Sequence, residues 1–285
     1  MAESSLVQNP GDILDLIDLE RYPIDDLEGG KGAQFARDCR AQMDAQGWCN
    51  LDQFIRPDAL AALVAEASDL LPGAEQLTIK RTIYGGKVDA SVPEGDPRRR
   101  EYTHRALQLA DDQIPLETLI QRLYRSDKLT DFIRQVQGKQ ELYHYADEFQ
   151  ALNIVALQPG SWHGWHYDYN ECTVTLLLQA ADAGGEFTFI PNARSADGEN
   201  SELVDQFLAG DMTHARTFAR GAGTLTLFRG EFSLHGVTRI EGTRPRITAI
   251  FTYDEQPNRI ASDEINIRIY GQRAQRILEQ RRQSP

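Results

Sequence analysis

The feature that most constrains the fold of this chain is a change of hydrophobic period near residue 141. Beyond it, apolar and polar residues alternate in short runs typical of half-buried strands, and turns containing glycine or proline separate the runs. The runs cover residues 142–146, 152–157, 173–179, 186–190, 224–228 and 246–253. Many short strands after a helical block predict an α+β protein with a double-stranded β-helix core, like that of jelly rolls and cupins.

The first 140 residues have mainly helical patterns. Apolar residues recur every three or four positions over 35–43 and again over 60–71, where Pro57 marks a start and Pro72-Gly73 a stop. Two more helices are predicted over 116–124 and 127–137, the second with Ser126 as its N-cap and Gly138 beyond its end. Residues 80–101 are predicted to form a long loop, and long loops in compact domains often act as lids.

These patterns predict one domain over residues 1–285. Residues 1–140 would supply the helical support and the lid loop, and residues 141–255 the β-helix core. A polar, partly helical insertion is expected at 195–220, and residues 256–285 would form a C-terminal extension.

Composition excludes several classes of partner as the default. The formal net charge is −13 and the pI is near 4.9, which argues against nucleic acid and anionic membranes. No apolar stretch approaches the roughly 20 residues that span a bilayer. The N-terminus lacks the features of a signal peptide, and the three cysteines include no Cys-x-x-Cys pair, so a cytoplasmic setting is expected.

Three residues have the chemistry of a metal site: His166, Asp168 and His235. An extended backbone points the side chains of His166 and Asp168 the same way, because they are two residues apart. Two neutral imidazoles and one carboxylate on one face of a metal suit non-haem Fe(II), which needs open positions for O2 and a co-substrate. Each histidine alone is more often structural, and only the combination favours a metal.

Arg246 and Thr248 follow the second histidine on one face of a predicted strand. A guanidinium fork and a hydroxyl on the inside of a barrel could bind one carboxylate, such as the distal carboxylate of 2-oxoglutarate. An internal salt bridge to an acidic residue is the alternative role for this arginine.

The candidates for substrate binding are less specific. His163 precedes the metal motif by three residues and could touch substrate or support a ligand. Trp165 could line a pocket, although packing explains it equally well. Glu148, Asn153, Arg98 and Arg99 could meet polar or acidic groups of a substrate, or could simply be structural or surface residues.

With these residues in place, the chain resembles the Fe(II)/2-oxoglutarate-dependent oxygenase superfamily. Within it, the chain is similar to the branch of standalone amino-acid hydroxylases and radical halogenases. The resemblance covers about residues 80–275 and rests on His163–Asp168, Gly185–Pro191, His235–Thr248, Tyr253–Asp254, Ile269–Arg273 and Asp96–Arg99. It implies that His166, Asp168 and His235 hold iron and that Arg246 anchors 2-oxoglutarate.

The same resemblance implies an enzyme that uses Fe(II), 2-oxoglutarate and O2 to oxidise an unactivated C–H bond, with succinate as co-product. Halogenases of this branch have a small residue where Asp168 stands, so the carboxylate implies hydroxylation or desaturation. A small polar substrate is expected, such as a free amino acid or a derivative. Two alternatives stay open: a non-catalytic metal-binding barrel that senses a small acid, and a protein-modifying oxygenase. The oligomeric state is not predicted.

Overall fold

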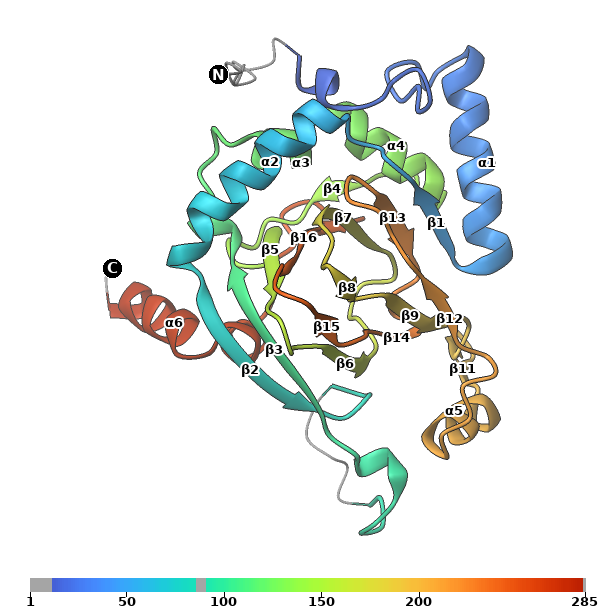
Figure 1. Ribbon diagram of the computed structural model, residues 1–285, viewed down its shortest axis with the longest axis vertical. Helices are drawn as coiled ribbons and strands as arrows, with labels where there is room; N and C mark the ends of the chain where they lie inside the picture. Colours follow the sequence, from blue (N-terminus) through green and yellow to red (C-terminus); the bar gives the residue numbers. More distant parts are fainter. Residues whose placement is uncertain (1–11, 86–90, 284–285) are drawn as a thin grey trace.

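The computed structural model describes residues 12–85 and 91–283, and a large antiparallel sheet organises them. Its seven strands run in the order β1 (Trp48–Leu51), β13 (Leu225–Phe228), β7 (Thr173–Gln179), β16 (Arg246–Phe251), β5 (Leu152–Leu157), β3 (Tyr102–Leu109) and β2 (Glu75–Arg81). Figure 1 shows these strands curving around one side of the interior. The predicted strands at 152–157 and 173–179 have the bounds expected from their sequence patterns.

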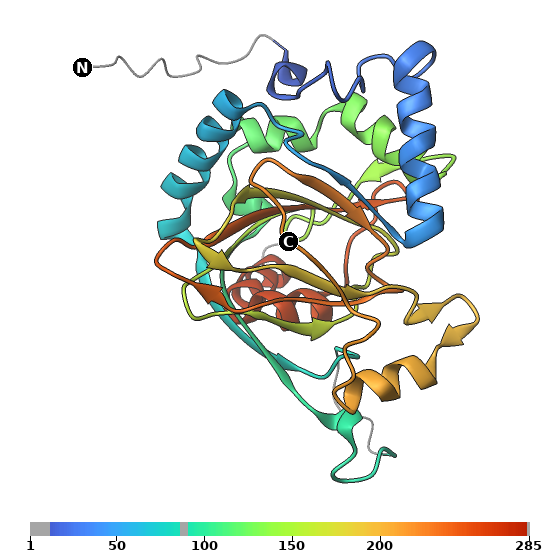
Figure 2. The same ribbon diagram turned by 45° about the vertical axis from the view of Figure 1, so that its right-hand side comes forward.

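A second, smaller sheet faces the first. It contains β12 (Arg216–Phe218), β9 (Phe187–Ile190), β14 (Leu234–Val237) and β6 (His163–His166), in that order. Two-stranded pairs complete the strands: β8 (Ala183–Gly184) with β15 (Ile240–Glu241), β4 (Tyr143–His144) with β17 (Tyr253–Asp254), and β10 (Arg194–Ser195) with β11 (Gly198–Glu199). The mixed architecture with two opposed antiparallel sheets confirms the predicted α+β class and double-stranded β-helix core (Figures 1 and 2).

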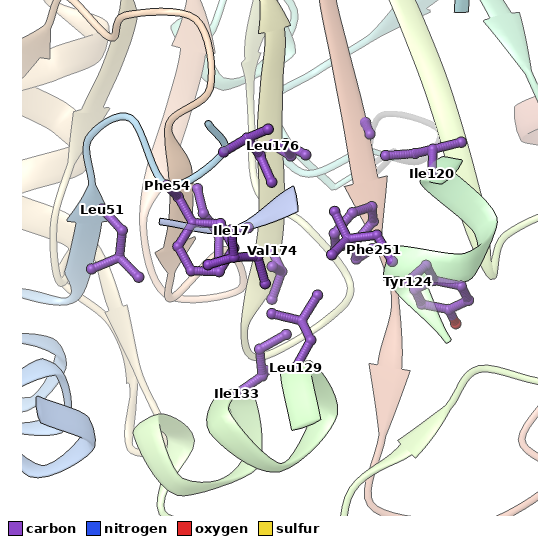
Figure 3. Packing of buried hydrophobic residues seen from close by; sticks show 14 of the residues in the cluster. Ile17, Leu51, Phe54, Ile120, Tyr124, Leu129, Ile133, Val174, Leu176 and Phe251 are labelled. Atoms are coloured by element: carbon purple, nitrogen blue, oxygen red, sulfur yellow. The ribbon is translucent and has the colours of Figure 1, made fainter. Parts of the chain in front are cut away.

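The alternation along the large sheet separates the core from the interior pocket. Ile247, Ala249 and Phe251 of β16 lie in the main hydrophobic core, together with Val174 and Leu176 of β7. The alternate residues of the same strands face the space between the sheets. Figure 3 shows the core side, where side chains of β7 and β16 meet those of the helices. A period of two therefore places apolar residues outward toward the helices, while the inward face holds polar residues such as Thr175 and Thr248 beside apolar ones such as Ile250.

Helices cover the outer face of the large sheet (Figure 2). They are α1 (Gly30–Gln46), α2 (Pro57–Leu70), α3 (Leu119–Tyr124) and α4 (Asp127–Gln137), with short 3-10 turns at Ile13–Leu16, Leu71–Gly73, Pro97–Arg99 and Asp111–Gln113. The Ser126 side chain caps α4, and Gly138 ends it in the left-handed conformation at φ 68°. The helix predicted from residue 116 begins only at Leu119, because Thr118 takes the N-cap position.

The first 140 residues are less helical than their sequence predicts. They contribute β1, β2 and β3 to the large sheet, and the predicted loop at 80–101 joins β2 to β3. The sequence pattern did not predict β2, because charged and polar side chains occupy one face of this strand and leave no apolar run. Within that loop, residues 86–90 lie outside the described residues. The predicted insertion contains α5 (Ser201–Leu208), but its last part is β12, which pairs with β9 of the small sheet.

The predicted C-terminal extension forms α6 (Asp263–Gln283), which lies beside β2 and β3 (Figure 1). Gly271 interrupts it with φ 61° and ψ −141°. Just before this break, the Tyr270 hydroxyl donates to the Phe149 carbonyl at 2.9 Å. This hydrogen bond links the C-terminal helix to the segment just before β5. Among the residues described, no helix is both long and apolar enough to cross a bilayer.

Candidate active site

The three predicted metal ligands meet in the small sheet. β6 and β14 are antiparallel neighbours, and their register places His166 opposite His235. Asp168 follows β6 by two residues, and its carboxylate oxygens lie 3.3 Å from His166 Nε2 and 3.4 Å from His235 Nε2. The three ligand atoms all lie within 4.8 Å of one another. Sheet register therefore joins a motif at 166–168 to a histidine 69 positions further along.

Backbone carbonyls orient both imidazoles. His166 Nδ1 lies 2.8 Å from the Gly164 carbonyl, and His235 Nδ1 lies 2.9 Å from the Ser233 carbonyl. An Nδ1–H that donates to a carbonyl leaves the Nε2 lone pair free toward the carboxylate. Burial, with the nearby charges of Arg81 and His235, lowers the pKa of His166 to about 3. This imidazole is therefore neutral near pH 7, as a metal ligand must be.

Asp168 is held as a carboxylate. Burial alone would raise its pKa, but His235 and His166 hold the pKa well below its usual range. The Thr173 hydroxyl donates to Asp168 Oδ2 at 2.5 Å. Gly230 allows this close packing, since a Cβ there would lie 2.5 Å from Asp168 Oδ2 and 2.4 Å from Thr173 Oγ1. This N, N, O donor set, fixed by outer hydrogen bonds, fits Fe(II).

Arg246 and Thr248 lie on the large sheet, across the interior from the small sheet. Both are buried, with 5% of each residue exposed. Arg246 Nε donates to the Gly185 carbonyl at 3.0 Å, and Nη1 donates to the Thr248 hydroxyl. Burial lowers the pKa of Arg246 to about 10, which leaves it charged near neutral pH. Among the described residues it has no acidic partner, so the alternative of an internal salt bridge is not seen. A buried guanidinium without a carboxylate fits the distal end of 2-oxoglutarate.

A pocket of about 230 Å³ connects the two groups. Both sheets line it, and Ile269 and Tyr270 of α6 close one side. Its lining contains one carboxylate, Asp168, and three guanidinium groups, those of Arg81, Arg220 and Arg246. The interior is therefore a positively charged cavity with a predicted metal site in its wall.

Two of the predicted substrate residues line this pocket. His163 stacks between His104 and His166, with ring centroids 3.9 and 4.2 Å away, and its Nε2 accepts a hydrogen bond of 2.9 Å from Arg81. Asn153 Oδ1 accepts from Gln108 at 2.7 Å, and it shares the Tyr270 hydroxyl proton, at 2.9 Å, with the Phe149 carbonyl.

The structure does not bring the other four into the pocket lining. Glu148 forms an ion pair with Arg281 of α6. Trp165 packs against Phe207, with ring centroids 4.9 Å apart. Arg98 pairs with Asp96 at 2.6 Å, and Arg99 donates to the Val92 carbonyl at 2.6 Å. The prediction that these residues bind substrate is unsupported by their positions, since each has a partner elsewhere.

Sequence reasoning missed several pocket residues, among them Arg81, His104, Arg220 and Tyr270. Arg81 and His104 lie on β2 and β3, and Tyr270 lies on the C-terminal helix. His104 is buried, and its ring packs against that of His163. The sequence pattern could have predicted His104, because Tyr102, His104 and Ala106 alternate along the chain and would share one face of a strand.

The family model "Halogenase D" matches residues 32–270 of the chain. No curated protein sequence matches it. Among solved structures, AviO1 from Streptomyces viridochromogenes Tue57 is 15% identical, with a TM-score of 0.54 over 80% of this chain and 97% of that one. HygX from Streptomyces hygroscopicus, solved with nickel and 2-oxoglutarate, is 13% identical, with a TM-score of 0.51 over 78% and 87%.

The carbocyclase SnoK from nogalamycin biosynthesis, a non-haem α-ketoglutarate-dependent enzyme, is 12% identical and has a TM-score of 0.54 over 76% of this chain and 83% of that one. At such identities these structures establish the fold alone. With the match to the family model over most of its length, the chain belongs to the Halogenase D family and has the fold of Fe(II)/2-oxoglutarate oxygenases.

Proposed function

We propose that this protein is a non-haem Fe(II)/2-oxoglutarate-dependent dioxygenase that hydroxylates or desaturates an unactivated C–H bond of a small polar substrate. The observation that carries the proposal is that His166, Asp168 and His235 converge in one pocket. The same pocket contains Arg246, which is buried and has no acidic partner among the described residues. Bound iron and 2-oxoglutarate would supply the oxidising chemistry, with 2-oxoglutarate converted to succinate and CO2. The protein's part is to hold and orient both reactants.

The residues divide the pocket into two ends. His166, Asp168 and His235 would hold the metal, while Arg246 and Thr248 would hold the distal carboxylate of the co-substrate. The substrate would lie at the other end, near His163, Asn153 and Arg81. Arg81 has no acidic partner among the residues described, and its Nη2 donates to His163. A substrate with a carboxylate, such as a free amino acid or a derivative, would supply the missing anion.

Asp168 supports hydroxylation or desaturation over halogenation. If Asp168 ligates the metal together with the two histidines, a bidentate 2-oxo acid would leave a position for O2 and none for a halide. The observation that favours a halogenating alternative is the family match. A pocket of about 230 Å³ that lies between the two sheets, in contrast, suits a small molecule better than a protein substrate.

The decisive experiment measures succinate formation by Fe(II)-loaded protein with a panel of amino acids, small acids and amines. We expect one class of compound to stimulate succinate formation. The product of that compound should be heavier by one oxygen atom or lighter by two hydrogen atoms. His235→Ala is the inactive control. If no compound stimulates turnover although the protein binds metal and 2-oxoglutarate, the non-catalytic sensing alternative is favoured.

A further inference from the structure

Arg220 is a buried arginine that the proposed function has not used. It lies between β12 and β13, with 9% of the residue exposed, and it lines the same pocket as Arg246. Its Nη1 donates to the Thr175 hydroxyl at 3.1 Å, and its guanidinium carbon lies 4.7 Å from the centre of the Phe187 ring. Its Nε is buried without any hydrogen-bond partner. A buried, charged donor without an acceptor costs free energy, so we expect a ligand to accept hydrogen bonds from this guanidinium.

The surroundings of Arg220 indicate which ligand this is. No acidic side chain of the described residues pairs with it, and the only carboxylate of the pocket lining, Asp168, is engaged by two histidines and Thr173. Burial and the nearby charge of Arg246 hold the pKa of Arg220 well below its usual range. Two guanidinium groups that repel each other in one end of a cavity are stabilised when an anion lies between them.

We infer that Arg220 is a second guanidinium for the distal carboxylate of the 2-oxo acid, opposite Arg246. This inference rests on the proposed function, because it assumes that Arg246 binds that carboxylate. Each arginine already donates one N–H to a threonine, Arg220 to Thr175 and Arg246 to Thr248. Both guanidinium groups are thereby oriented and keep N–H donors free, and one carboxylate offers about four acceptor sites for them. The pair would make the pocket selective for dicarboxylic 2-oxo acids.

The test compares two ligands on Ni(II)-loaded full-length protein, which binds without turnover. Calorimetry gives the Kd of 2-oxoglutarate and of 2-oxopentanoate, which has the same chain length but no distal carboxylate. Arg220→Gln is expected to raise the Kd of 2-oxoglutarate about ten- to hundred-fold. It should change the Kd of 2-oxopentanoate less than about threefold, since that ligand has nothing for Arg220 to bind.

Arg216→Gln is the matched control, because Arg216 lies on the adjoining strand with its side chain exposed. Arg220→Lys, which keeps the charge without the planar fork, should give an intermediate Kd and shows that the fold tolerates change at this position. The nickel affinity of each variant reports whether the metal site is intact.

Three results would overturn the inference. An unchanged Kd of 2-oxoglutarate in Arg220→Gln would place the carboxylate away from Arg220. An equal loss for both ligands would place Arg220 at the shared 2-oxo acid end or in the fold. A loss of nickel binding in both Arg220 variants would give the residue a structural role. If wild-type protein fails to prefer 2-oxoglutarate and Arg246→Gln has no effect, the proposed function itself fails instead.

Discussion

His166 and His235 lie opposite each other on antiparallel strands, with ring centroids 4.2 Å apart. Their Nδ1 atoms are both engaged by carbonyls two residues upstream, so both Nε2 atoms turn to the Asp168 carboxylate. The two histidines therefore have the same local geometry on two strands of one sheet. Such a pair is preorganised for a metal, because neither ring has to rotate on binding.

Removing either histidine should abolish metal binding. Alanine at His166 or His235 deletes one of the donors and leaves a cavity on the inner face of the small sheet. Titration with Fe(II) under anaerobic conditions should show a large loss of affinity, with circular dichroism close to that of the wild type. A His235→Ala variant with full activity would contradict the assignment.

Thr173→Val should weaken metal binding, although Thr173 is not itself a metal ligand. The variant removes the hydroxyl that donates to Asp168 Oδ2, and losses of this kind commonly cost about 10–100-fold in metal affinity. Thr226→Val is the matched control, since the Thr226 hydroxyl donates to Asn50 in the same sheet. Equal metal affinity in both variants and the wild type would show that Thr173 does not position Asp168.

Arg246→Ala should impair the use of 2-oxoglutarate. Removing one partner of a buried ionic pair costs about 3–5 kcal/mol, so the KM for 2-oxoglutarate should rise by about two orders of magnitude or more. Arg246→Lys should restore only part of the affinity, because lysine lacks the fork. Steady-state kinetics at saturating substrate measure both. A KM within a few-fold of the wild-type value would place the anchor elsewhere, with Arg220 the next residue to test.

Asp168 should prevent halogenation. Wild-type protein is expected to give no chlorinated product in high chloride, since the carboxylate fills the position that a halide would need. Asp168→Gly opens that position but provides no donors to hold an anion, and small misplacements of reactants are costly. The variant should lose hydroxylation and give at most traces of chlorinated product by mass spectrometry. Chlorination by the wild type would show that Asp168 is not a ligand.

His104 should make the fold sensitive to acid. Burial and the charge of Arg81 lower its pKa to about 3, whereas an unfolded histidine titrates near 6.5. Between those values the unfolded chain binds more protons, so the stability contribution is complete above pH 6.5 and is lost as the pH falls. The loss at pH 5 is about 2 kcal/mol for this one group.

The variant that tests this is His104→Phe, which keeps a flat ring against His163 but cannot titrate. Chemical denaturation of metal-free protein at pH 7 and pH 5 should show a smaller fall in unfolding free energy for the variant than for the wild type. Equal falls in both proteins would mean that His104 is already protonated in the folded state.

The sequence by itself determined the features that depend on local geometry. His166 and Asp168 share a direction because extended backbone repeats every two residues, and Arg246 shares a face with Thr248 for the same reason. The strands at 152–157 and 173–179 and the caps of α4 also follow from local patterns. These local patterns and the residue types on them were enough to predict the three candidate metal ligands and the fold class of the protein.

Only the tertiary structure decided which distant residues meet. Arg81, Arg220 and Tyr270 reach the pocket from the edge of the large sheet, from the turn before β13 and from the C-terminal helix. No local pattern marks them, because strand pairing and helix docking between segments far apart in sequence set their positions. Docking of the C-terminal helix also draws Glu148 to Arg281, away from the pocket. Periodicity along a strand gives the direction of a side chain, but sheet register and docking decide what it faces.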